Sequence, residues 1–511
     1  CNSSQKTPLH LWILMSNREK SEFVTCIRQD GTVVPFSYQQ LLEKAKIVAS
    51  NLMNMRECKN KNIVLIINNI TQFFPIFWGC ILAGATVTPL GTSSDMDFSS
   101  DGAVGKRILD VTNIAKPEFI IVGEEEKNGV EKLLFSETIL SVDDINKNTD
   151  YIYQKPDIKE DDVCLLMFTS GSTGEPKGVP LTHKNILGRS KGFIDFYQLY
   201  GKDRMLNWMP MDHVGGVLMY HICGVINFSY QVQIETKYIL RDPIRWLKCI
   251  EKYNIINTWA PNFAYGLLLE YKEEVKKLNI SLKSLKYIFN GGEAINYNAC
   301  KKFMDLLKEK GVSSNAMIPC WGMTETSSGV LYSNCFGKII YNNSVAVGRP
   351  IKGVRVRVVD ANKKPVPKGQ VGELEVCGVT TLSGYYKREN NNSKYFTEDG
   401  WFDTGDQAMI LEEEVIITGR SKELIIRNGL NVSCLEIEKC IEEIDCIQTG
   451  TVGCSVIKEE DTNQDKVCIF YGEADDMPNE QIKDKISFQM MKNYGFSFDY
   501  LVPIQLNKIP R

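Results

Sequence analysis

The chain has 511 residues, more than the roughly 250–300 at which a single compact core stops growing, so we expect at least two domains. Its residues are 43% hydrophobic and 24% charged, and this ordinary balance excludes a mostly disordered chain and a fibrous repeat. A formal net charge of −4 gives no support to a basic nucleic-acid-binding surface, so no nucleic-acid partner is expected.

The 16 cysteines do not follow a metal-binding pattern. The sequence contains no CxxC pair and only 4 histidines, so it lacks the closely spaced ligands of a structural zinc site. We expect buried free thiols in a reducing, cytoplasmic compartment. The sequence starts without Met and without a signal-peptide pattern, which leads us to expect part of a larger multidomain chain.

The most apolar stretch, residues 73–90, is long enough to span a membrane. Pro75, Gly79, Gly84 and Pro89 interrupt it, and a strand-like run precedes it. These features favour a buried helix followed by a strand, and we expect no membrane contact.

Short apolar runs alternate with amphipathic patterns through the first 420 residues. Strands are predicted at 63–67, 119–122, 163–168, 255–259 and 287–289, and helices at 244–253 and 299–310. This alternation predicts α/β layers with largely parallel sheets. From Val354 the pattern changes to short strands joined by turns, and after Arg420 to a hairpin, a helix and a charged segment, so we place a domain boundary near residues 419–423.

An apolar strand ending at Phe168 leads into a loop rich in hydroxyl groups and glycine. The loop consists of Thr169, Ser170, Gly171, Ser172, Thr173 and Gly174, and Lys177 follows it. Such a backbone wraps around an anion, while the hydroxyl groups and the lysine hold phosphate oxygens. A Walker A motif is excluded because Glu175 and Pro176 separate Gly174 from Lys177. We therefore predict a phosphate-binding loop rather than a flexible surface loop.

The segment TSGSTGEPKGV resembles the signature loop of the adenylate-forming superfamily, which includes acyl-CoA synthetases, luciferases, fatty acyl-AMP ligases and the adenylation domains of peptide and polyketide synthases. Nine further segments similar to the family's motifs keep the family's order, at 36–42, 81–90, 207–217, 289–295, 321–326, 347–350, 372–378, 400–406 and 419–438. The resemblance implies that the chain uses ATP and Mg²⁺ to convert a carboxylic acid into an acyl-adenylate, with release of pyrophosphate.

The resemblance also implies an α/β fold. A large N-terminal domain, residues 1–420, would combine two α/β subdomains with a small β-barrel-like subdomain and carry the ATP site and the acyl pocket. A small mobile α+β C-terminal domain, residues 421–511, would follow. Lys422 lies at the position of the family's hinge, about which this domain rotates between two half-reactions, although a solvated surface charge is the alternative.

The family's catalytic roles fall on a few side chains of this sequence. By the resemblance, the loop residues 169–174 and Lys177 hold the β- and γ-phosphates, and Thr324 contacts the α-phosphate. Glu325 would hold Mg²⁺, a hard cation that prefers carboxylate oxygen. His213 would lie near the substrate carboxylate and the thiol tunnel, although a lone histidine is more often simply packed.

The nucleoside would be held by a second group of residues. By the resemblance, Trp321 lies against adenine, Asp406 accepts the ribose hydroxyl groups, and Arg420 contacts ribose or phosphate. The other implied nucleotide-binding positions are Gly291, Gly292, Glu293 and Gly322. The predicted walls of the acyl pocket are Asp212, His213, Val214, Gly215, Asn262, Phe263, Gly291 and Ser327. These walls mix apolar and polar groups and do not identify the acid.

Two departures from the family pattern bear on function. The family's catalytic lysine follows a glycine near the C-terminus, and the printed sequence stops before that motif, so no residue here is assigned to it. Amino-acid-activating domains carry a Phe-Asp pair near the segment at 207–217, where this chain has none, and this argues against an ordinary α-amino acid. The segments WMPMDHVGGV, DPIRWL and TWAPNFAYGLL resemble loading adenylation domains of bacterial polyketide or hybrid synthases.

Three functions remain open at this point. In the first, the acyl group passes to the phosphopantetheine thiol of a carrier protein as the loading step of a synthase. In the second, the chain is a stand-alone acyl-CoA synthetase or fatty acyl-AMP ligase, with free CoA as the acceptor of a synthetase. In the third, it is a catalytically retired nucleotide-binding scaffold. The retained Lys177, Thr324, Glu325, Asp406 and Arg420 count against the third.

Overall fold

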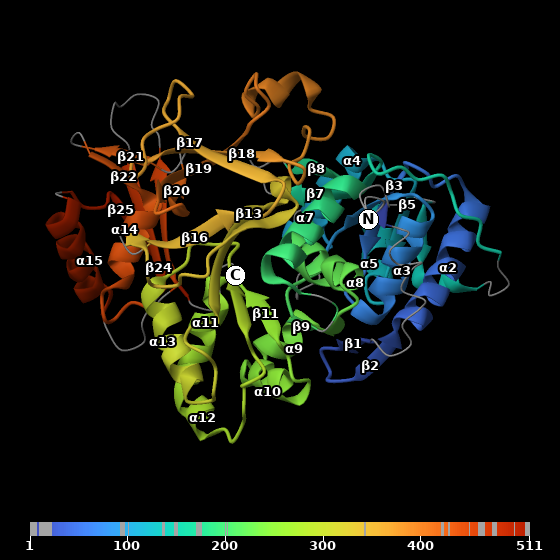
Figure 1. Cartoon of the computed structure of the whole chain (residues 1–511), viewed down its shortest axis with the longest axis horizontal. Coiled ribbons are helices and arrows are strands. Elements are labelled where there is room, and N and C mark those ends of the chain that lie inside the picture. The colour runs from blue at the N-terminus through green and yellow to red at the C-terminus, as the bar shows by residue number, and fades with distance from the viewer. Residues whose placement is uncertain are drawn as a thin grey trace.

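A computed structural model gives the structure of most of the chain. It describes residues 8–9, 23–91, 98–100, 102–134, 138–147, 152–169, 176–199, 201, 203–341, 344–420, 424–427, 430–448, 450–457, 466–472, 478–494 and 496–505. Two large sheets, with helices packed against them, form the N-terminal part, and a small sheet with two helices follows at the C-terminal end (Figure 1).

The first large sheet has six strands. Their order is β6 (Ile139–Ser141), β5 (Phe119–Val122), β3 (Asn62–Ile66), β4 (Thr86–Pro89), β7 (Val163–Thr169) and β8 (Lys177–Thr182). All neighbours are parallel except β7 and β8. The strands predicted at 63–67, 119–122 and 163–168 are confirmed within a residue.

Helices cover both faces of this sheet because successive strand residues point to opposite faces. On β3, Ile63 and Leu65 share a core with α2 (Tyr38–Met55) and α3 (Ile70–Leu82). Val64 and Ile66 share another core with α4 (Ala103–Ala115) and α5 (Lys127–Leu134). The short α6 (Val142–Asn146) follows β6.

The apolar stretch at 73–90 therefore folds as predicted, into the buried helix α3 and the central strand β4. Among the helices that the structure describes, none combines the length and apolar character needed to cross a membrane.

The second sheet contains the remaining strands of the N-terminal part. Their order is β17 (Val354–Val359), β18 (Gly372–Gly378), β19 (Phe402–Leu411), β20 (Glu414–Arg420), β16 (Ser344–Pro350), β14 (Ser328–Tyr332), β13 (Met317–Met323), β12 (Tyr287–Asn290), β11 (Asn257–Ala260), β9 (Arg204–Asn207), β10 (Tyr230–Ile234), β1 (Phe23–Ile27) and β2 (Val33–Ser37), with β15 (Ile340–Tyr341) beside β16.

Pairing is parallel from β1 through β10, β9, β11 and β12 to β13, and antiparallel from β14 onward. The antiparallel strands continue the hydrogen bonding of the parallel ones, so the predicted β-barrel-like subdomain extends the second sheet. The helices between β8 and β13 in the chain are α7 (His183–Tyr197), a π-helix at Gly215–Ile222 that runs into α8 (Cys223–Ile226), α9 (Thr236–Leu240), α10 (Ile244–Lys252), α11 (Asn262–Glu270), α12 (Lys272–Lys277) and α13 (Tyr297–Lys308). Short 3₁₀ turns lie at Thr324–Thr326 and Glu389–Lys394.

The helix starts follow local capping rules. Thr182 accepts the backbone N–H of Asn185, and the Asn185 side chain accepts the N–H of Thr182 in return, which fixes the start of α7 at His183. The described cysteines are free thiols, most of them buried.

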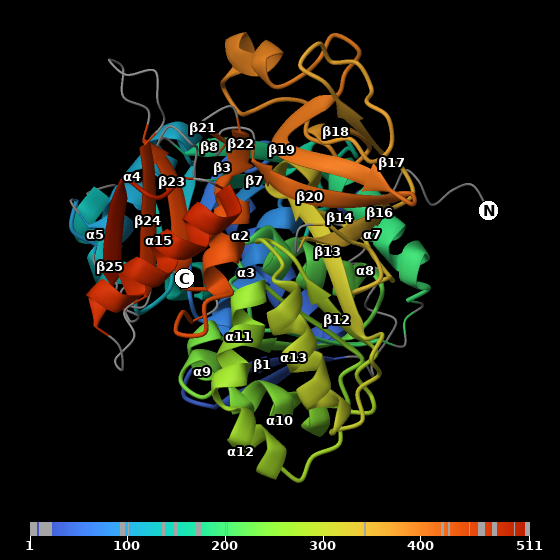
Figure 2. The ribbon, with the colours of Figure 1, turned by 90° about the vertical axis from the view of Figure 1, so that its left-hand side faces the viewer.

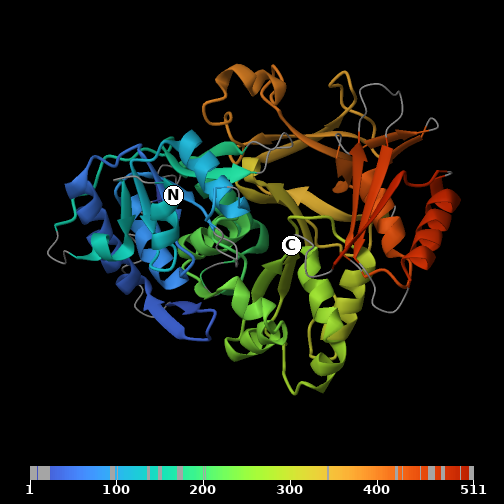
Figure 3. The ribbon, with the colours of Figure 1, turned by 180° about the vertical axis from the view of Figure 1, so that it is seen from behind.

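The C-terminal elements build a separate core. They are the hairpin β21 (Leu424–Arg427) and β22 (Leu430–Ser433), α14 (Cys434–Glu442), the sheet β23 (Val452–Ile457), β24 (Lys466–Gly472) and β25 (Tyr500–Ile504), and α15 (Asn479–Tyr494). Their hydrophobic cluster draws only on residues from Ile425 onward. Figures 2 and 3 show this small α+β domain beside the helices and antiparallel strands of the second sheet.

Polar contacts join α14 to the large domain. Lys439, which is 7% exposed, donates from Nζ to the Ser344 hydroxyl at 2.7 Å. Asn296 donates from Nδ2 to a Glu442 carboxylate oxygen at 2.9 Å. Burial lowers the pKa of Lys439 to about 8, against an opposing effect of Glu442, Glu436 and Glu438.

The lowered pKa of Lys439 predicts that domain docking depends on pH. An undocked lysine has a pKa near 10.4, so docking releases a proton and becomes more favourable as the pH rises from about 8 towards 10. Limited proteolysis at pH 7 and pH 9.5 measures this: cleavage between the domains should slow at the higher pH. Lys439→Met should remove the pH dependence, and an unchanged dependence in that variant would contradict the assignment to Lys439.

Candidate active site

Two predicted catalytic residues meet at a pair of tyrosines. Glu325 lies in the turn after β13, is 5% exposed, and accepts the Tyr385 hydroxyl at 2.8 Å. Lys177 begins β8, and its Nζ lies over the rings of Tyr385 and Tyr395, 5.2 and 4.6 Å from their centroids. The aromatic faces stabilise the ammonium group, so the tyrosines hold Lys177 close to the Glu325 carboxylate.

The two tyrosines did not emerge from the sequence as functional residues. The sequence signal that could have indicated them is the group of tyrosines after Gly384. Tyrosines also pack in hydrophobic cores, so this signal does not by itself indicate a functional role. The contacts of Tyr385 with both Glu325 and Lys177 distinguish it from a tyrosine that only packs in the core.

The environment of Glu325 fits a divalent cation. Burial raises the pKa of its carboxyl group, and Tyr385, Lys177 and Arg420 oppose that rise. A buried carboxylate gains from a nearby cation, and Mg²⁺ is usually held by one or two carboxylates together with substrate phosphates. In the ranges that the structure covers, no group of three or more His, Cys, Asp or Glu side chains could hold a metal. Glu325 is thus a single buried carboxylate that could hold a divalent cation together with oxygen atoms of a bound substrate.

Thr324 opens the same turn and is half-buried. Gly322 precedes it on β13, where a Cβ atom would lie 2.2 Å from the Ser328 carbonyl oxygen, so only glycine fits this approach. Thr169 pairs with Lys177 across β7 and β8. The predicted loop residues Ser170, Gly171, Ser172, Thr173 and Gly174, and the predicted hinge Lys422, lie outside the described residues.

A second cluster forms around Asp406, which is 6% exposed. The Trp321 indole donates from Nε1 to Asp406 Oδ2 at 2.8 Å, and Arg420 Nε lies 3.2 Å from Asp406 Oδ1. Asp406 and Arg420 are also direct partners across β19 and β20. The structure thus joins the three residues predicted to hold the nucleoside, and it adds an indole N–H contact that the sequence did not indicate.

A third cluster forms around Trp259, a buried residue of β11. The His213 ring stacks on this indole, with 5.8 Å between centroids and 20° between planes, and His213 Nδ1 accepts the Gly215 N–H at 3.0 Å. A Cβ atom on Gly215 would lie 2.1 Å from the Trp259 ring, and one on Gly292 would lie 4.0 Å from it. His213 is solvent-exposed on one side, yet the protein atoms around it lower its pKa by desolvation.

The other predicted pocket residues do not all share this cluster. A Cβ atom on Gly291 would meet Cys320, 2.6 Å from its sulfur and its carbonyl oxygen. Val214 is buried in the core of the first sheet. The Ser327 hydroxyl donates to the Thr380 carbonyl at 2.7 Å and so serves a backbone contact.

Asn262 is 6% exposed and its side-chain oxygen accepts the Asn296 N–H at 3.1 Å, which fixes the start of α13. The Phe263 N–H donates to the predicted nucleotide-binding residue Glu293 at 2.5 Å. The side chains of Asn262 and Glu293 are thus both hydrogen-bonded to backbone N–H groups of the protein.

Asp212 precedes His213 and opposes the lowering of its pKa, but its carboxylate has another cationic partner. Its carboxylate pairs with Arg107 at 3.1 Å and lies in the wall of a cavity of about 450 Å³. That cavity is also lined by Phe73, Leu90 and Met211, and by none of the other predicted pocket residues. The negative charge of Asp212 is thus balanced by Arg107 and not by a group of the Trp259 cluster.

Comparison with known proteins identifies the family of this chain. Residues 16–386 match the family model of AMP-binding enzymes. The chain belongs to this family. Its members form acyl-adenylates, and the chain is accordingly an adenylate-forming ligase that uses ATP.

Relatives resemble it along almost the whole chain. It is 30% identical over 481 residues to the nonribosomal peptide synthetase pngA of Aspergillus terreus, covering 91% of this chain and 50% of the relative. It therefore spans about half the length of that relative.

Two solved structures resemble the fold closely. One is McyG A-PCP complexed with phenylalanyl-adenylate, with a TM-score of 0.92 and 30% identity over 100% of this chain and 93% of that one. The other is a multidomain structure of a keto acid-selecting NRPS module, with a TM-score of 0.90 and 25% identity over 100% of this chain and 45% of that one. The chain is thus an adenylation domain of the peptide-synthetase type.

Trp321→Phe should weaken ATP binding by roughly 10- to 100-fold, because a hydrogen bond to a charged group contributes about 1.5–3 kcal/mol and phenylalanine retains only the aromatic ring. Isothermal titration calorimetry with ATP, in the absence of an acid, measures the change. An affinity within twofold of the unmodified protein would show that the indole N–H does not support the nucleotide site.

Gly215→Ala should lower kcat/KM for the acid by roughly 10-fold while leaving ATP affinity unchanged. The added Cβ atom would collide with Trp259, which is 3% exposed and is fixed by its Nε1 donating to Asn207 at 3.0 Å. Gly453→Ala is the matched control, since its Cβ atom would meet nothing closer than 3.8 Å. Steady-state kinetics with equal loss in both variants would contradict the pocket assignment.

Proposed function

We propose that the chain activates a keto acid, or another carboxylic acid without an α-ammonium group, as its acyl-adenylate. It then delivers the acyl group to the phosphopantetheine thiol of a carrier protein, as the loading step of a peptide or hybrid polyketide synthase. The observation that carries the first half-reaction is the meeting of Lys177, Glu325 and Tyr385 beside a separate cluster of Trp321, Asp406 and Arg420.

The two clusters match the electrostatic demands of adenylate formation. A carboxylate attacks the α-phosphorus of ATP, and both reactants are anions, so the reaction needs positioning and charge neutralisation. Lys177 supplies a positive charge for the phosphates, and Glu325 would hold the Mg²⁺ that neutralises them when it is bound. Asp406, oriented by Trp321 and Arg420, would accept the two ribose hydroxyl groups.

The surroundings of Trp259 support an acid that lacks a cationic group. His213 stacks on the Trp259 ring, and Gly215 and Gly292 lie close to the same ring, so the described groups here are aromatic and backbone groups that suit an aromatic or apolar side chain. The one carboxylate in the segment 207–217, Asp212, is already paired with Arg107. The solved module described above that selects keto acids gives this substrate class a precedent at 25% identity.

Transfer to a carrier is the second half of the proposal. A structure at 30% identity contains an adenylation domain together with a carrier domain, A-PCP, which supports a carrier protein as the acceptor. We place the boundary of the moving domain at residues 420 and 421 and the hinge at Lys422, consistent with the separate core that starts at Ile425. Mg²⁺ is proposed as the metal at Glu325.

The decisive experiment pairs acids that differ only at the α-carbon. The chain, both as its 511 residues and with any residues that follow Arg511 in its reading frame, is incubated with ATP, Mg²⁺ and hydroxylamine. Phenylpyruvate is compared with phenylalanine, and the keto and amino forms of leucine with each other. We expect hydroxamates from the keto acids only, detected by mass spectrometry. Hydroxamates from the amino acids alone would overturn the substrate class.

Glu325→Gln tests the catalytic core in the same assay. Removing the charge that would hold Mg²⁺ should lower hydroxamate formation by about 100-fold or more. Glu131→Gln, at an exposed position of α5, is the control and should retain full activity. ATP binding without product from any acid, in every form of the chain, would favour the retired scaffold.

Acceptor identity is a separate measurement on the same protein. The acyl-adenylate is offered either free CoA or a phosphopantetheine-loaded carrier protein, and thioester formation is followed by mass spectrometry. We expect transfer to the carrier, whereas transfer to CoA alone would identify a stand-alone acyl-CoA synthetase.

A further inference from the structure

Asp406 owes its direction to a bulge in β19. Asp403 pairs with Glu375 of β18, and Gln407 pairs with Glu373. Only Leu374 of β18 therefore faces the three residues 404–406 of β19, and Gly405 adopts a φ of +73°. Bulges of this kind change the direction of a side chain, and here the bulge presents Asp406 to Trp321 and Arg420.

Three short hydrogen bonds fix the shape of the bulge. The Thr404 hydroxyl donates to the Leu374 carbonyl at 2.8 Å, and the Asp406 N–H donates to the same hydroxyl at 3.1 Å. The Gly405 N–H donates to Asp403 Oδ1 at 2.9 Å. Asp403 thus holds the N–H of Gly405, the residue that immediately precedes Asp406.

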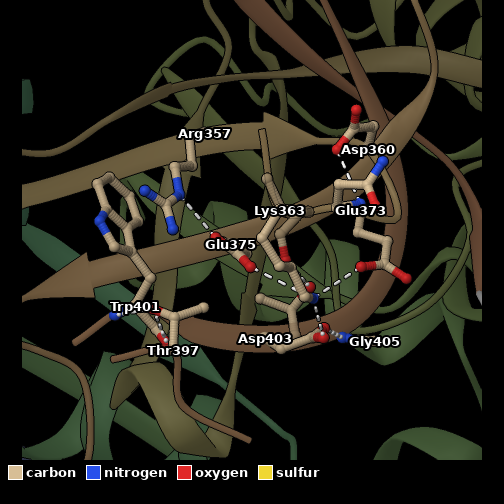
Figure 4. A network of polar contacts seen from close by, with 12 residues as sticks. Arg357, Asp360, Lys363, Glu373, Glu375, Thr397, Trp401, Asp403 and Gly405 are labelled. Atoms are coloured by element: carbon tan, nitrogen blue, oxygen red, sulfur yellow. Dashed lines mark hydrogen bonds and ion pairs between the residues drawn. The ribbon is translucent and has the colours of Figure 1, made fainter. Parts of the chain in front are cut away.

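The other oxygen of Asp403 is held by a lysine from a neighbouring turn (Figure 4). Lys363 Nζ lies 2.8 Å from Asp403 Oδ2, 2.7 Å from Glu373 Oε2 and 3.3 Å from Glu375 Oε1. Lys363 lies in the turn between β17 and β18, so one ammonium group joins that turn to β18 and β19.

Without this ammonium group the three carboxylates would repel one another. Glu375 is fully buried, and its remaining cationic partner is Arg357, 2.6 Å from Oε2. Arg357 also binds Asp399 at 2.9 Å and stacks on Trp401, so its charge is shared. Carboxylates buried without a compensating positive charge are strongly unfavourable. If Asp403 moved away to reduce this repulsion, it would no longer accept the Gly405 N–H.

We propose that Lys363 is a positioning residue for the nucleotide site. It neutralises the carboxylate cluster so that Asp403 holds the bulge, and the bulge presents Asp406 to the ribose hydroxyl groups. This inference rests on the proposed function, because it takes Asp406 as the ribose acceptor.

The test compares ATP with 2′,3′-dideoxy-ATP, which lacks both hydroxyl groups that Asp406 would accept. Isothermal titration calorimetry of the unmodified chain, without an acid, should show ATP bound at least 10-fold more tightly. Lys363→Met should reduce this preference to about threefold or less, by weakening ATP binding and leaving dideoxy-ATP binding unchanged. Lys364→Met, an exposed neighbour in the same turn, is the matched control and should keep the full preference.

Two variants of Asp403 keep the test decisive if Lys363→Met folds poorly. Asp403→Asn retains an oxygen that accepts the Gly405 N–H and should keep most of the preference for ATP, whereas Asp403→Ala should lose it. Thermal denaturation of each variant separates folding from positioning.

The possible results distinguish a failure of this inference from a failure of the proposed function. A full preference for ATP in Lys363→Met or Asp403→Ala, with or without a lower melting temperature, would mean that the cluster only stabilises the fold and would overturn the inference alone. An unmodified chain that does not bind ATP would overturn the proposed function, and this inference with it. An unmodified chain that binds both nucleotides equally would remove Asp406 as the ribose acceptor and overturn the inference.

Discussion

Two buried carboxylates, Glu325 and Asp406, impose the main physical constraint on this molecule. Taking an ionised carboxylate out of water is strongly unfavourable unless hydrogen bonds and opposite charges replace the lost hydration. Each has such partners: Tyr385 and the neighbouring Lys177 for Glu325, and Trp321 with Arg420 for Asp406. The surrounding strands must therefore bring distant side chains within hydrogen-bonding distance, and the proposed adenylate-forming site lies where they do.

The architecture meets this constraint by continuing one sheet from parallel to antiparallel strands. The parallel part carries Trp259 and the glycines at the ends of its strands, where ligand sites of open α/β sheets lie. The antiparallel part carries Asp406 and Arg420 on adjacent strands. Because β13 lies at the change from one pairing to the other, Trp321 on that strand reaches Asp406 directly.

The C-terminal domain is held against the large domain by polar contacts, including one from a buried lysine. Its own core is independent, and its described polar contacts with the large domain include a buried lysine whose charge is unfavourable there. A domain held in this way is more easily displaced than one held by a large apolar interface. That property suits the proposed alternation between adenylation and thiol transfer.

The sequence alone determined the order of the motifs, the α/β class and the local elements. Periodicity and interrupting prolines and glycines were sufficient for the helix and strand at 70–89, because those signals act over a few residues. Motif resemblance was sufficient for Lys177, Glu325, Asp406 and Arg420 as candidates.

The tertiary structure decided which side chains meet. Trp321 and Asp406 are 85 residues apart, Tyr385 and Glu325 are 60 apart, and Lys363 and Asp403 are 40 apart. Such contacts depend on strand register and on a bulge, and a shift of one residue in register would point these side chains to the opposite face of the sheet.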